Sequence, residues 1–220
     1  MRAMSNQPSL RITEIFHSLQ GEALTVGLPT VFVRLTGCPL RCQYCDTAYA
    51  FEGGEQITLE AILDQVATYG ARYVTVTGGE PMAQPNVLPL MKALCDAGYE
   101  VSIETSGAMP IDAIDERVSI VLDLKTPGSR EVARNNLDNL RRLRARDQLK
   151  FVICDHDDYV WSKAQIDQHD LAGRVGAILF SPSHEELKPK QLAEWILKDS
   201  LPVRMQMQMH KYIWGDEPGH

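Results

Sequence analysis

Residues 30–45 read TVFVRLTGCPLRCQYC, a mostly apolar run followed by a loop with three cysteines. The run Thr30–Leu35 is typical of a buried strand, because β-branched and aromatic side chains fit a pleated surface. Cys38, Cys42 and Cys45 then follow with CxxxCxxC spacing. A structural zinc site or a fully ligated iron–sulfur cluster takes four protein ligands, and the local supply here stops at three. A cubane cluster bound by three cysteines leaves one iron open for a reactive ligand.

A second motif, Thr77-Gly78-Gly79-Glu80-Pro81, comes one predicted strand–helix unit later. Its two glycines let the backbone approach a ligand closely, and Glu80 offers a carboxylate that can accept from an ammonium group. Alone, the motif is also typical of a turn before a proline that starts a helix. The triplet alone also leaves open a zinc ion with three cysteines and a distant histidine. Together the two motifs favour the open cluster over zinc.

Composition narrows the class of protein. The chain has 220 residues and a net charge of −7, which argues against direct binding to nucleic acid or membranes. No apolar run reaches transmembrane length, and Met1–Pro8 lacks the apolar core of a signal peptide, so we expect a cytoplasmic protein. In a reducing compartment the clustered cysteines predict metal ligands, and Cys95 and Cys154 are predicted as inert core residues.

Short β-rich runs alternate with amphipathic stretches along the whole chain. This alternation predicts βα units around a parallel sheet, in a single domain over residues 1–220. The predicted core strands are Thr30–Leu35, Tyr73–Thr77, Glu100–Glu104, Ser119–Leu124, Leu149–Ile153, Gly176–Phe180 and Val203–Met207. Leu10–Phe16 is predicted as an extra strand at the edge of the sheet.

Apolar residues at helical spacing predict helices between several of these strands. Thr58 and Asn86 are placed to cap the first two of them. Leu137–Leu143 and Leu192–Leu197 mark two more, and the basic run within residues 141–146 is predicted as a solvated helix face, with a contact to tRNA or an acidic partner as the alternative. Ile111–Arg117 is too short for a full crossover helix, so we expect a trimmed connection there.

Polar and glycine-rich segments follow the predicted strands at their carboxyl ends. They are the cysteine loop, Gly78–Glu80, Thr105–Gly107, Asp123, Lys125, Ser181–His184 and His210–Tyr212. Because the carboxyl ends of parallel strands meet at one edge, we expect these residues to share a site.

Two features near the cysteine loop, the pair Asp46-Thr47 and the strand residue Arg34, each keep two interpretations on these grounds. Asp46 is typical of a turn cap, whereas the Thr47 hydroxyl offers an oxygen ligand to a hard cation such as Mg²⁺. Spacing alone favours the cap. Arg34 is either a structural ion-pair partner or a bidentate clamp for a carboxylate.

Several motifs occur in a specific order, and their combination resembles a known family. They are Leu19-Gln20-Gly21-Glu22, Cys45-Asp46-Thr47, Thr77-Gly78-Gly79-Glu80-Pro81, Glu104-Thr105-Ser106-Gly107 and His210-Lys211-Tyr212. The cysteine triplet with the Gly-Gly-Glu motif resembles the radical S-adenosylmethionine (SAM) superfamily, in which the open iron binds the amino and carboxylate groups of SAM. All the motifs together resemble the 7-carboxy-7-deazaguanine synthase family, from Ile12 to Asp216.

This resemblance implies an α/β fold, a modified and partial (βα)6-type radical SAM barrel with trimmed helices. It implies a carbon–nitrogen lyase that converts 6-carboxy-5,6,7,8-tetrahydropterin to 7-carboxy-7-deazaguanine with loss of ammonia, in the biosynthesis of queuosine and other 7-deazapurines. The implied cofactors are a [4Fe–4S] cluster, SAM and Mg²⁺, and SAM is regenerated. The implied partners are an electron donor such as flavodoxin or ferredoxin and a second copy in a homodimer.

The resemblance also implies residue roles. Cys38, Cys42 and Cys45 hold the cluster, and Thr47 binds Mg²⁺, which reverses the preference for a turn cap. The implied SAM-binding residues are Tyr44, Asp46, Gly79, Glu80, Ser106, Asp123, Lys125, Ser181 and His184. The implied pterin-binding residues are Leu19, Gln20, Gly21, Glu22, Arg34, Thr77, His210 and Asp216, in part from an N-terminal extension (residues 1–29) and a C-terminal tail (residues 209–220).

The tail departs from some members of that family, which end a few residues after the His-Lys-Tyr motif, where the terminal carboxylate can reach the substrate. This chain continues to His220. We therefore expect the side chain of Asp216 to accept from the two parallel N–H donors of a pterin.

Two other classes remain as alternatives. An activator of a glycyl-radical enzyme shares the CxxxCxxC spacing but acts on a protein, and Gln20–Glu22 and His210–Tyr212 favour the pterin instead. An electron-transfer iron–sulfur protein would need a fourth ligand and no Gly-Gly-Glu pocket.

Overall fold

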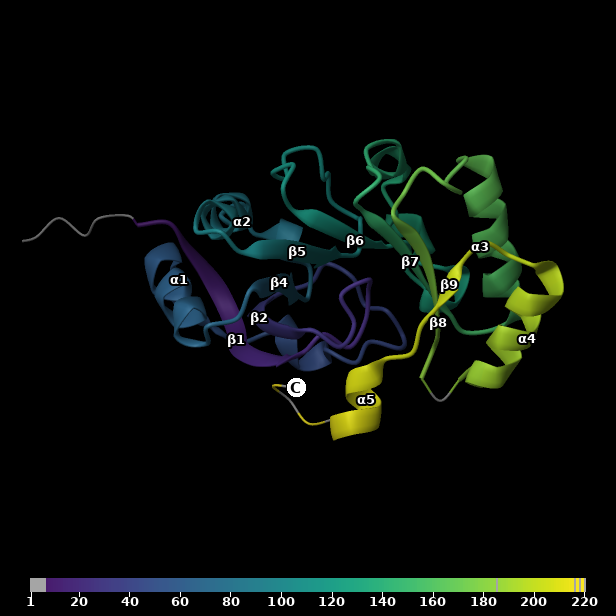
Figure 1. The fold of residues 1–220 in the computed structure, drawn as a ribbon, viewed down its shortest axis with the longest axis horizontal. Helices are drawn as coiled ribbons and strands as arrows, with labels where there is room; N and C mark the ends of the chain where they lie inside the picture. Colours follow the sequence, from purple (N-terminus) through teal and green to yellow (C-terminus); the bar gives the residue numbers. More distant parts are fainter. Residues whose placement is uncertain (1–6, 185, 216, 218, 220) are drawn as a thin grey trace, which may run out of the picture.

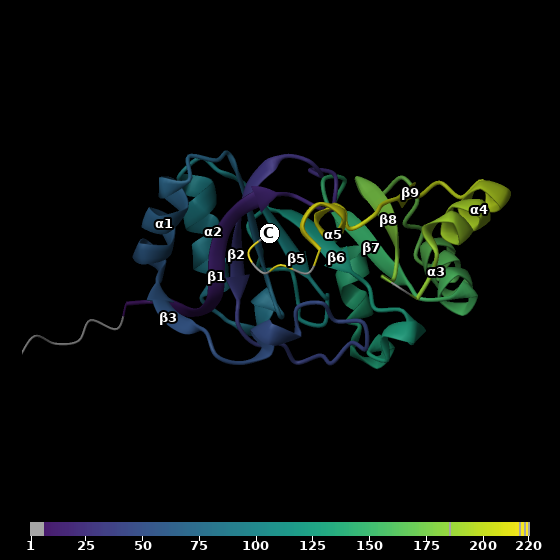
Figure 2. The same cartoon turned by 90° about the horizontal axis from the view of Figure 1, so that it is seen from below.

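The computed structural model describes residues 7–184, 186–215, 217 and 219, and its strands form one sheet (Figures 1 and 2). The strands are β1 (Ser9–Leu19), β2 (Pro29–Leu35), β3 (Glu55–Thr58), β4 (Tyr73–Gly78), β5 (Glu100–Thr105), β6 (Ser119–Asp123), β7 (Gln148–Ile153), β8 (Ala177–Pro182) and β9 (Arg204–Met205). Their order is β3-β1-β2-β4-β5-β6-β7-β8-β9. From β2 to β9 all neighbours are parallel, while β1 runs antiparallel to β2 and β3. The sheet does not close, so the predicted partial α/β barrel is confirmed.

Five α-helices occur in the described residues, and four of them cover the two ends of this sheet. They are α1 (Leu59–Thr68), α2 (Val87–Asp96), α3 (His156–Gln168), α4 (Pro189–Asp199) and α5 (Met209–Trp214). Figure 1 shows α1 and α2 near the first strands and α3 and α4 near the last. Thr58 caps α1 by accepting from the amide of Ala61, as predicted. Asn86 occupies the N-cap of α2, but its side chain donates to the carbonyl of Ser9 instead.

The middle of the sheet lacks full crossover helices, which confirms the trimmed connection predicted at Ile111–Arg117. Ile111 and Ile114 still pack into the core from this segment. The β6–β7 connection has only short 3₁₀ helices, one of them at Leu137–Arg141, where we predicted an α-helix. Because this segment does not continue as a helix, the basic run is not a solvated helix face. Instead, Arg144 pairs with the buried Asp147 at 2.8 Å.

The strands differ from prediction at both ends of the sheet. The segment predicted as an edge strand at Leu10–Phe16 is the longer β1, which pairs on both sides, and the edge belongs to β3, which was not predicted. β3 has a mixed, half-exposed pattern of four residues that periodicity does not reveal. The predicted strand Val203–Met207 is reduced to β9, after which the chain turns toward α5.

The helix α3 was also missed, because its inward face is largely polar. Asp158, Tyr159 and Ser162 are buried, so the hydrophobic pattern that identifies an amphipathic helix is absent. The Asp158 carboxylate accepts from the Thr126 hydroxyl at 2.9 Å and from the amide of Gly128 at 2.8 Å. Buried carboxylates need such donors, and these two fix the connection that follows β6.

The β1–β2 loop crosses the concave side of the open sheet. The amide of Leu24 donates to the Gln148 side chain on β7 at 2.8 Å, and the amide of Ala23 donates to the Gln206 side chain after β9 at 2.9 Å. Ala23 packs in a small apolar cluster with Val121 and Leu179. The loop therefore joins the first strands to the last and adds Ala23 to the core on the open side of the sheet.

In the part of the chain that the structure describes, every helix is too short or too polar to cross a lipid bilayer.

Candidate functional site

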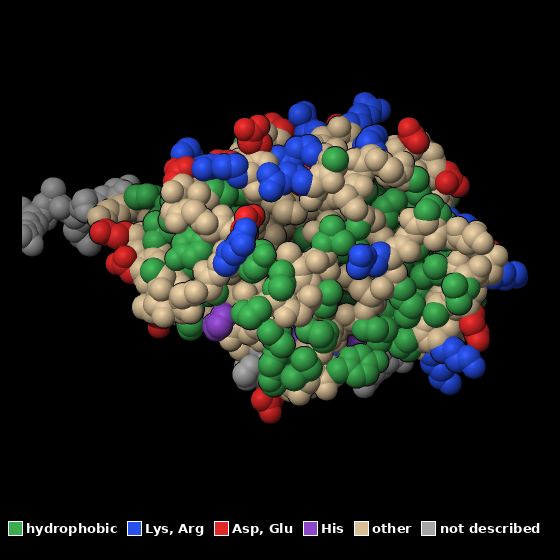
Figure 3. Space-filling view, viewed as in Figure 1, with side chains coloured by type: hydrophobic (Ala, Val, Ile, Leu, Met, Phe, Trp, Pro, Cys, Tyr) green, Lys and Arg blue, Asp and Glu red, His purple; other side chains and the backbone are tan. Residues whose placement is uncertain are grey.

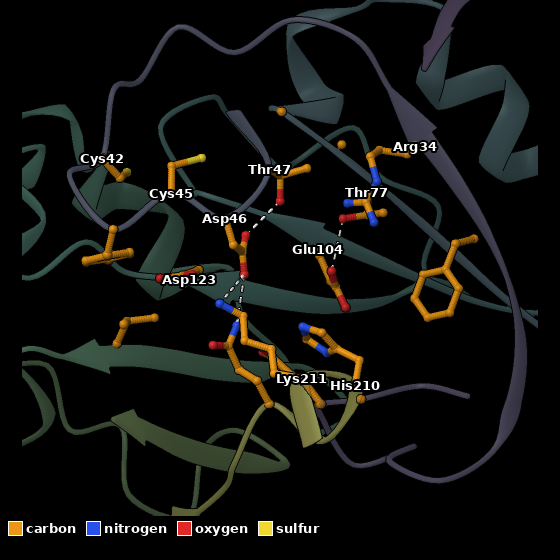
Figure 4. Close-up of a pocket in the computed structure, with 18 of the residues that line it drawn as sticks. Arg34, Cys42, Cys45, Asp46, Thr47, Thr77, Glu104, Asp123, His210 and Lys211 are labelled. Carbon is orange, nitrogen blue, oxygen red and sulfur yellow. Dashed lines mark hydrogen bonds and ion pairs between the residues drawn. The ribbon is translucent and has the colours of Figure 1, made fainter. Parts of the chain in front are cut away.

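A cavity of about 290 Å³ lies at the carboxyl ends of the strands, where the sequence placed the site (Figure 4). Its walls include these predicted residues: Leu19, Gln20, Gly21, Glu22, Arg34, Cys38, Cys42, Tyr44, Cys45, Asp46, Thr47, Thr77, Gly79, Ser106, Asp123, Lys125, His184 and His210. Glu80 and Ser181 are buried beside the cavity without lining it. Asp216 lies outside the described residues.

The three cysteines lie half-buried on the loop after β2. The amide of Cys45 donates to the carbonyl of Cys42 at 3.2 Å, and the Arg41 guanidinium donates to the carbonyl of Cys38 at 2.7 Å. Burial raises the pKa of each thiol, that of Cys42 to about 11. Burial thus favours the protonated thiols. Bound iron would favour the thiolates instead, because metal coordination stabilises them.

Neighbouring connections hold the cysteine loop in place. The amide of Arg41 donates to the Glu131 carboxylate at 2.6 Å, and the amide of Gln43 donates to the carbonyl of Ser129 at 3.2 Å. The Gln43 side chain donates to Glu186 at 2.8 Å. The loop is thus fixed by segments that follow β6 and β8, although no α-helix connects β6 to β7.

The loop after β4 packs directly on the cysteine loop. The amide of Gly79 donates to the carbonyl of Leu35 at 3.1 Å, and the amide of Glu80 donates to the carbonyl of Gly37 at 2.9 Å. A Cβ atom at Gly79 would lie only 2.2 Å from the Gly37 oxygen and 2.8 Å from the Cβ of Cys38. The glycine is therefore needed for the two loops to touch.

Glu80 is fully buried behind the cavity wall and is surrounded by donors from the protein itself. Its carboxylate accepts from the Met82 amide, the Thr105 hydroxyl, and both the amide and hydroxyl of Ser106. It therefore has four donors within the protein, and the ammonium contact inferred from sequence is not required to satisfy it. Its visible effect is to position Ser106, which does line the cavity.

One side of the cavity holds a polar group around Glu104, at the end of β5. Glu104 accepts from the Gln20 side chain at 3.3 Å and from the Thr77 hydroxyl at 3.0 Å. Burial raises the pKa of Glu104, and the nearby charge of Glu22 raises it further. Together these three side chains form a hydrogen-bonding face suited to a planar polar ligand.

A charged group occupies the middle of the cavity. Lys125 pairs with Asp123 at 3.1 Å, and Lys150 pairs with Glu22 and lies 3.9 Å from Asp123. Two buried polar atoms here, Oδ1 of Asp123 and the Tyr44 hydroxyl, have no hydrogen-bond partner among the described residues. Such orphaned atoms are the kind that a bound polar molecule satisfies.

Aromatic side chains form another wall. The rings of Phe16 and Phe32 stack with centroids 4.9 Å apart, and the Arg34 guanidinium lies 5.5 Å from the Phe16 centroid. Arg34 also donates through Nε to Glu14 at 2.6 Å, and the Tyr49 hydroxyl donates to the same carboxylate oxygen at 2.8 Å. The ion-pair interpretation of Arg34 is therefore confirmed, and its guanidinium also faces the cavity.

The tail closes the cavity opposite the sheet, where α5 lies between the two ends of the molecule (Figure 2). Asp46 accepts from Thr47 at 2.7 Å and from Gln208 at 3.0 Å, and Lys211 lies 3.8 Å away (Figure 4). His210 packs against Gly21, and burial lowers its pKa. The side chain of Asp46 thus contacts the tail, and no turn-capping bond involves it among the described contacts.

Comparison with known proteins decides the family. Residues 32–152 match the family model described as "Radical SAM superfamily". The chain is 43% identical to a 7-carboxy-7-deazaguanine synthase of Chlorobaculum tepidum, over 97% of this chain and 98% of the relative. The chain belongs to the 7-carboxy-7-deazaguanine synthase family. A second relative of that name, from Koribacter versatilis, is 40% identical over 94% of this chain and 98% of its own length.

A solved structure that resembles this 7-carboxy-7-deazaguanine synthase chain over nearly its whole length confirms the fold. The crystal structure of QueE from Escherichia coli superimposes with a TM-score of 0.70, at 26% identity, over 92% of this chain and 95% of that one. The chain is thus a radical SAM enzyme of 7-deazapurine biosynthesis. Membership of this superfamily implies a [4Fe–4S] cluster and SAM.

The residues present fit those two cofactors. No three His, Cys, Asp or Glu side chains within the described ranges gather closely enough to hold a single metal ion. A cubane instead takes each thiolate on a different iron, so its three cysteines lie further apart. The unpartnered polar atoms of Tyr44 and Asp123 belong to residues that line the same cavity as the cysteines, where a bound polar molecule would satisfy them.

Sequence reasoning missed several residues of this synthase site. They include Phe16, Phe32, Tyr49, Glu104, Lys150 and Gln208. Lys150 and Phe32 lie inside strands, where only the three-dimensional curvature of the sheet shows which face is concave. Glu104 carried a usable signal, since an acidic residue ends an otherwise apolar strand directly before Thr105-Ser106-Gly107.

Proposed function

We propose that this chain converts 6-carboxy-5,6,7,8-tetrahydropterin to 7-carboxy-7-deazaguanine with loss of ammonia. The observation that carries this proposal is a single cavity that joins the three cysteines to the polar group around Gln20, Thr77 and Glu104. A cofactor site and a site for a planar, polar ring therefore share one wall. The names of the relatives that match over nearly the whole chain support the same reaction.

The chain's own residues would bind and orient the pterin. The Glu104 carboxylate, which Gln20 and Thr77 hold in place, offers an acceptor to N–H groups at the ring edge, and Phe16 offers an apolar face. Arg34 is placed to pair with the substrate carboxylate, because Glu14 holds its guanidinium in one orientation. His210 covers the loop at Gly21 and helps to exclude water.

Cofactor placement follows the cysteine loop. Cys38, Cys42 and Cys45 would hold the cluster, and the Thr47 hydroxyl would bind Mg²⁺, a hard cation that accepts oxygen ligands. The SAM assignments at Tyr44, Asp46, Gly79, Ser106, Asp123, Lys125 and His184 rest on their place in the cavity wall, while Glu80 and Ser181 would act from behind it. Together, bound cluster and SAM supply the radical that removes hydrogen from the pterin.

The remaining parts of the proposal concern partners and organisation. An electron donor such as flavodoxin or ferredoxin would reduce the cluster, in a single cytoplasmic domain over residues 1–220. A homodimer is supported by apolar side chains exposed on α5, where Tyr212 is 72% and Ile213 49% accessible, on a face where Figure 3 shows apolar side chains gathered.

An anaerobic assay tests the proposed reaction. The cluster is reconstituted, and reductant, SAM, Mg²⁺ and 6-carboxytetrahydropterin are added, with product followed by mass and ultraviolet absorbance. Formation of 7-carboxy-7-deazaguanine without matching loss of SAM is the expected result. Cleavage of SAM without that product would instead mean that another substrate, such as a protein, occupies the cavity.

Replacing Glu14 with glutamine should weaken pterin binding without stopping SAM cleavage. The substitution keeps the shape but removes the charge that orients Arg34 through Nε. We expect the KM for the pterin to rise by about tenfold, the effect of one charge-assisted bond. The exposed pair of Arg72 and Glu100 supplies the control, and Glu100→Gln should leave KM unchanged. Equal KM values for the Glu14→Gln variant and the wild type would show that Arg34 needs no such support.

Replacing Lys211 with methionine should loosen the tail over the cavity. The Lys211 side chain is 11% exposed and its ammonium faces Asp46, so its loss leaves Gln208 as the described contact between Asp46 and the tail. We expect faster proteolytic cleavage within residues 209–215 and a KM for the pterin raised by roughly threefold to tenfold. Lys190→Met, in the exposed pair with Glu194, serves as the control. A cleavage rate equal to that of the wild type would contradict a role of Lys211 in holding the tail.

A further inference from the structure

Lys150 projects from β7 into the middle of the cavity, and sequence reasoning gave it no role. Its ammonium pairs with Glu22 of the β1–β2 loop and lies 3.9 Å from Asp123 at the end of β6. Its side chain is 13% exposed and that of Glu22 is 12% exposed. Both charges are therefore largely withdrawn from water, where a lost partner is costly.

The position of Lys150 joins the two halves of the proposed site. Glu22 follows Gln20, on the side where the pterin would lie, while Asp123 pairs with Lys125 on the side where SAM would lie. The amide of Leu24, next in the same loop, donates to Gln148, two residues before Lys150 on β7. The loop is thus fixed to β7 by one hydrogen bond, from a backbone amide to a side chain, and by one ion pair.

Charge balance at this centre depends on Lys150. This centre contains three carboxylates, those of Glu22, Asp123 and Glu104. Two ammonium groups, those of Lys125 and Lys150, offset their negative charge. Burial alone would lower the pKa of Lys150, but the charges of Glu22 and Asp123 outweigh burial and raise it above its ordinary value. The other charged or titratable groups that face the cavity are Arg34, Cys38, Cys42, Tyr44, Cys45, Asp46, Tyr49, His184, His210, Lys211 and Glu217.

We propose that Lys150 is a positioning residue of this reaction, whose cation holds the Glu22 loop against the cofactor side of the cavity and offsets the neighbouring carboxylate charges of Glu22 and Asp123. Its assignment to the pterin reaction rests on the proposed function, whereas its effect on the two carboxylates does not.

The effect on the carboxylates is tested by melting temperature as a function of pH. In Lys150→Met, buried carboxylates without their cation have pKa values above those in the unfolded chain. Such groups destabilise the folded state once the pH exceeds their unfolded pKa, and the penalty disappears as the pH falls. The deficit in Tm against wild type should therefore grow between about pH 5 and about pH 8, reaching several degrees.

Three further variants make this test specific. Adding Glu22→Gln to Lys150→Met removes one of the stranded charges, so the double variant should regain most of the lost Tm at pH 8. Lys150→Arg keeps the cation and should lie close to wild type. Lys92→Met breaks the exposed pair with Asp96, and its small deficit should stay constant over this range. A deficit of Lys150→Met that does not change with pH, or no recovery in the double variant, would overturn the proposal.

Kinetics test the role in the reaction itself. Lys150→Met should lower kcat/KM for 6-carboxytetrahydropterin on the order of a hundredfold, mainly through KM, and Lys150→Arg should recover most of it. An unchanged KM would overturn the positioning role. If the wild-type enzyme makes no 7-carboxy-7-deazaguanine while the pH pattern holds, the proposed substrate fails and the charge-holding role of Lys150 stands. If Lys150→Met yields no folded protein, recovery of folded protein in the double variant supports the proposal, and failure of both contradicts it.

Discussion

Replacing Cys42 with alanine is expected to remove the iron–sulfur cluster and reduce SAM cleavage to the background of the assay. The three cysteines line one cavity, and each is needed because a cubane held by three thiolates has no spare protein ligand. The measurement is iron and sulfide content after anaerobic reconstitution, together with the electron paramagnetic resonance signal of the reduced protein. Wild type should hold about four irons per chain and the variant close to none.

Cys154 provides the matched control for this experiment. It is half-buried at the end of β7, and its sulfur lies 3.9 Å from the Gln43 side chain on the cysteine loop. Burial raises the pKa of its thiol, with no metal role required to explain its position. Cys154→Ala should therefore keep its cluster and its SAM cleavage. A cluster that survives in Cys42→Ala but disappears in Cys154→Ala would mean that the ligand set has been misassigned.

Replacing Gly79 with alanine is expected to separate the two loops that enclose the cofactor site. The added methyl group would lie 2.2 Å from the Gly37 oxygen, which belongs to backbone and cannot rotate away. Overpacking of this kind costs about 1–3 kcal/mol, and more where backbone must shift. We expect a lower Tm and loss of SAM binding, measured by calorimetry on the protein with its cluster.

Gly70 separates this clash from ordinary glycine strain. It follows α1 with φ of +63°, and a Cβ atom there would meet nothing within 4 Å. Gly70→Ala should thus cost about 1 kcal/mol from its left-handed conformation while SAM binding stays intact. If both variants bound SAM equally well, close contact of the two loops would not be a requirement of the site.

The fold was predictable because most of its parallel strands are buried on both faces. β8 begins with the apolar run at residues 177–180, and β4 reads YVTVTG, which is rich in β-branched residues, so the positions of both strands follow from local sequence. The elements that were missed have no such local signal. The buried face of α3 includes the polar residues Asp158 and Ser162, and Asp158 accepts a hydrogen bond from the distant Thr126. Hydrophobic periodicity detects neither feature. β3 is recognised as a strand through its pairing with β1.

The candidate site divides along similar lines. Residues that follow the strands, such as the cysteines and Gly79, were predictable because strand ends meet at one edge of a parallel sheet. Glu14 and Lys150 lie within strands, and their part in the site depends on how the sheet curves and where the β1–β2 loop returns. The four protein donors to Glu80 could not be predicted, because they come from two separate loops.

Under the proposed function, the β1–β2 loop would couple the choice of substrate to the integrity of the barrel. Its Gln20 and Glu22 face the cavity, while Ala23 fills the core and two neighbouring amides bind Gln148 and Gln206. A grafted loop that recognised a different heterocycle would also have to replace this internal support. Changes of specificity in this scaffold should therefore carry compensating substitutions on β7 and after β9, far along the chain from the residues that touch the new substrate.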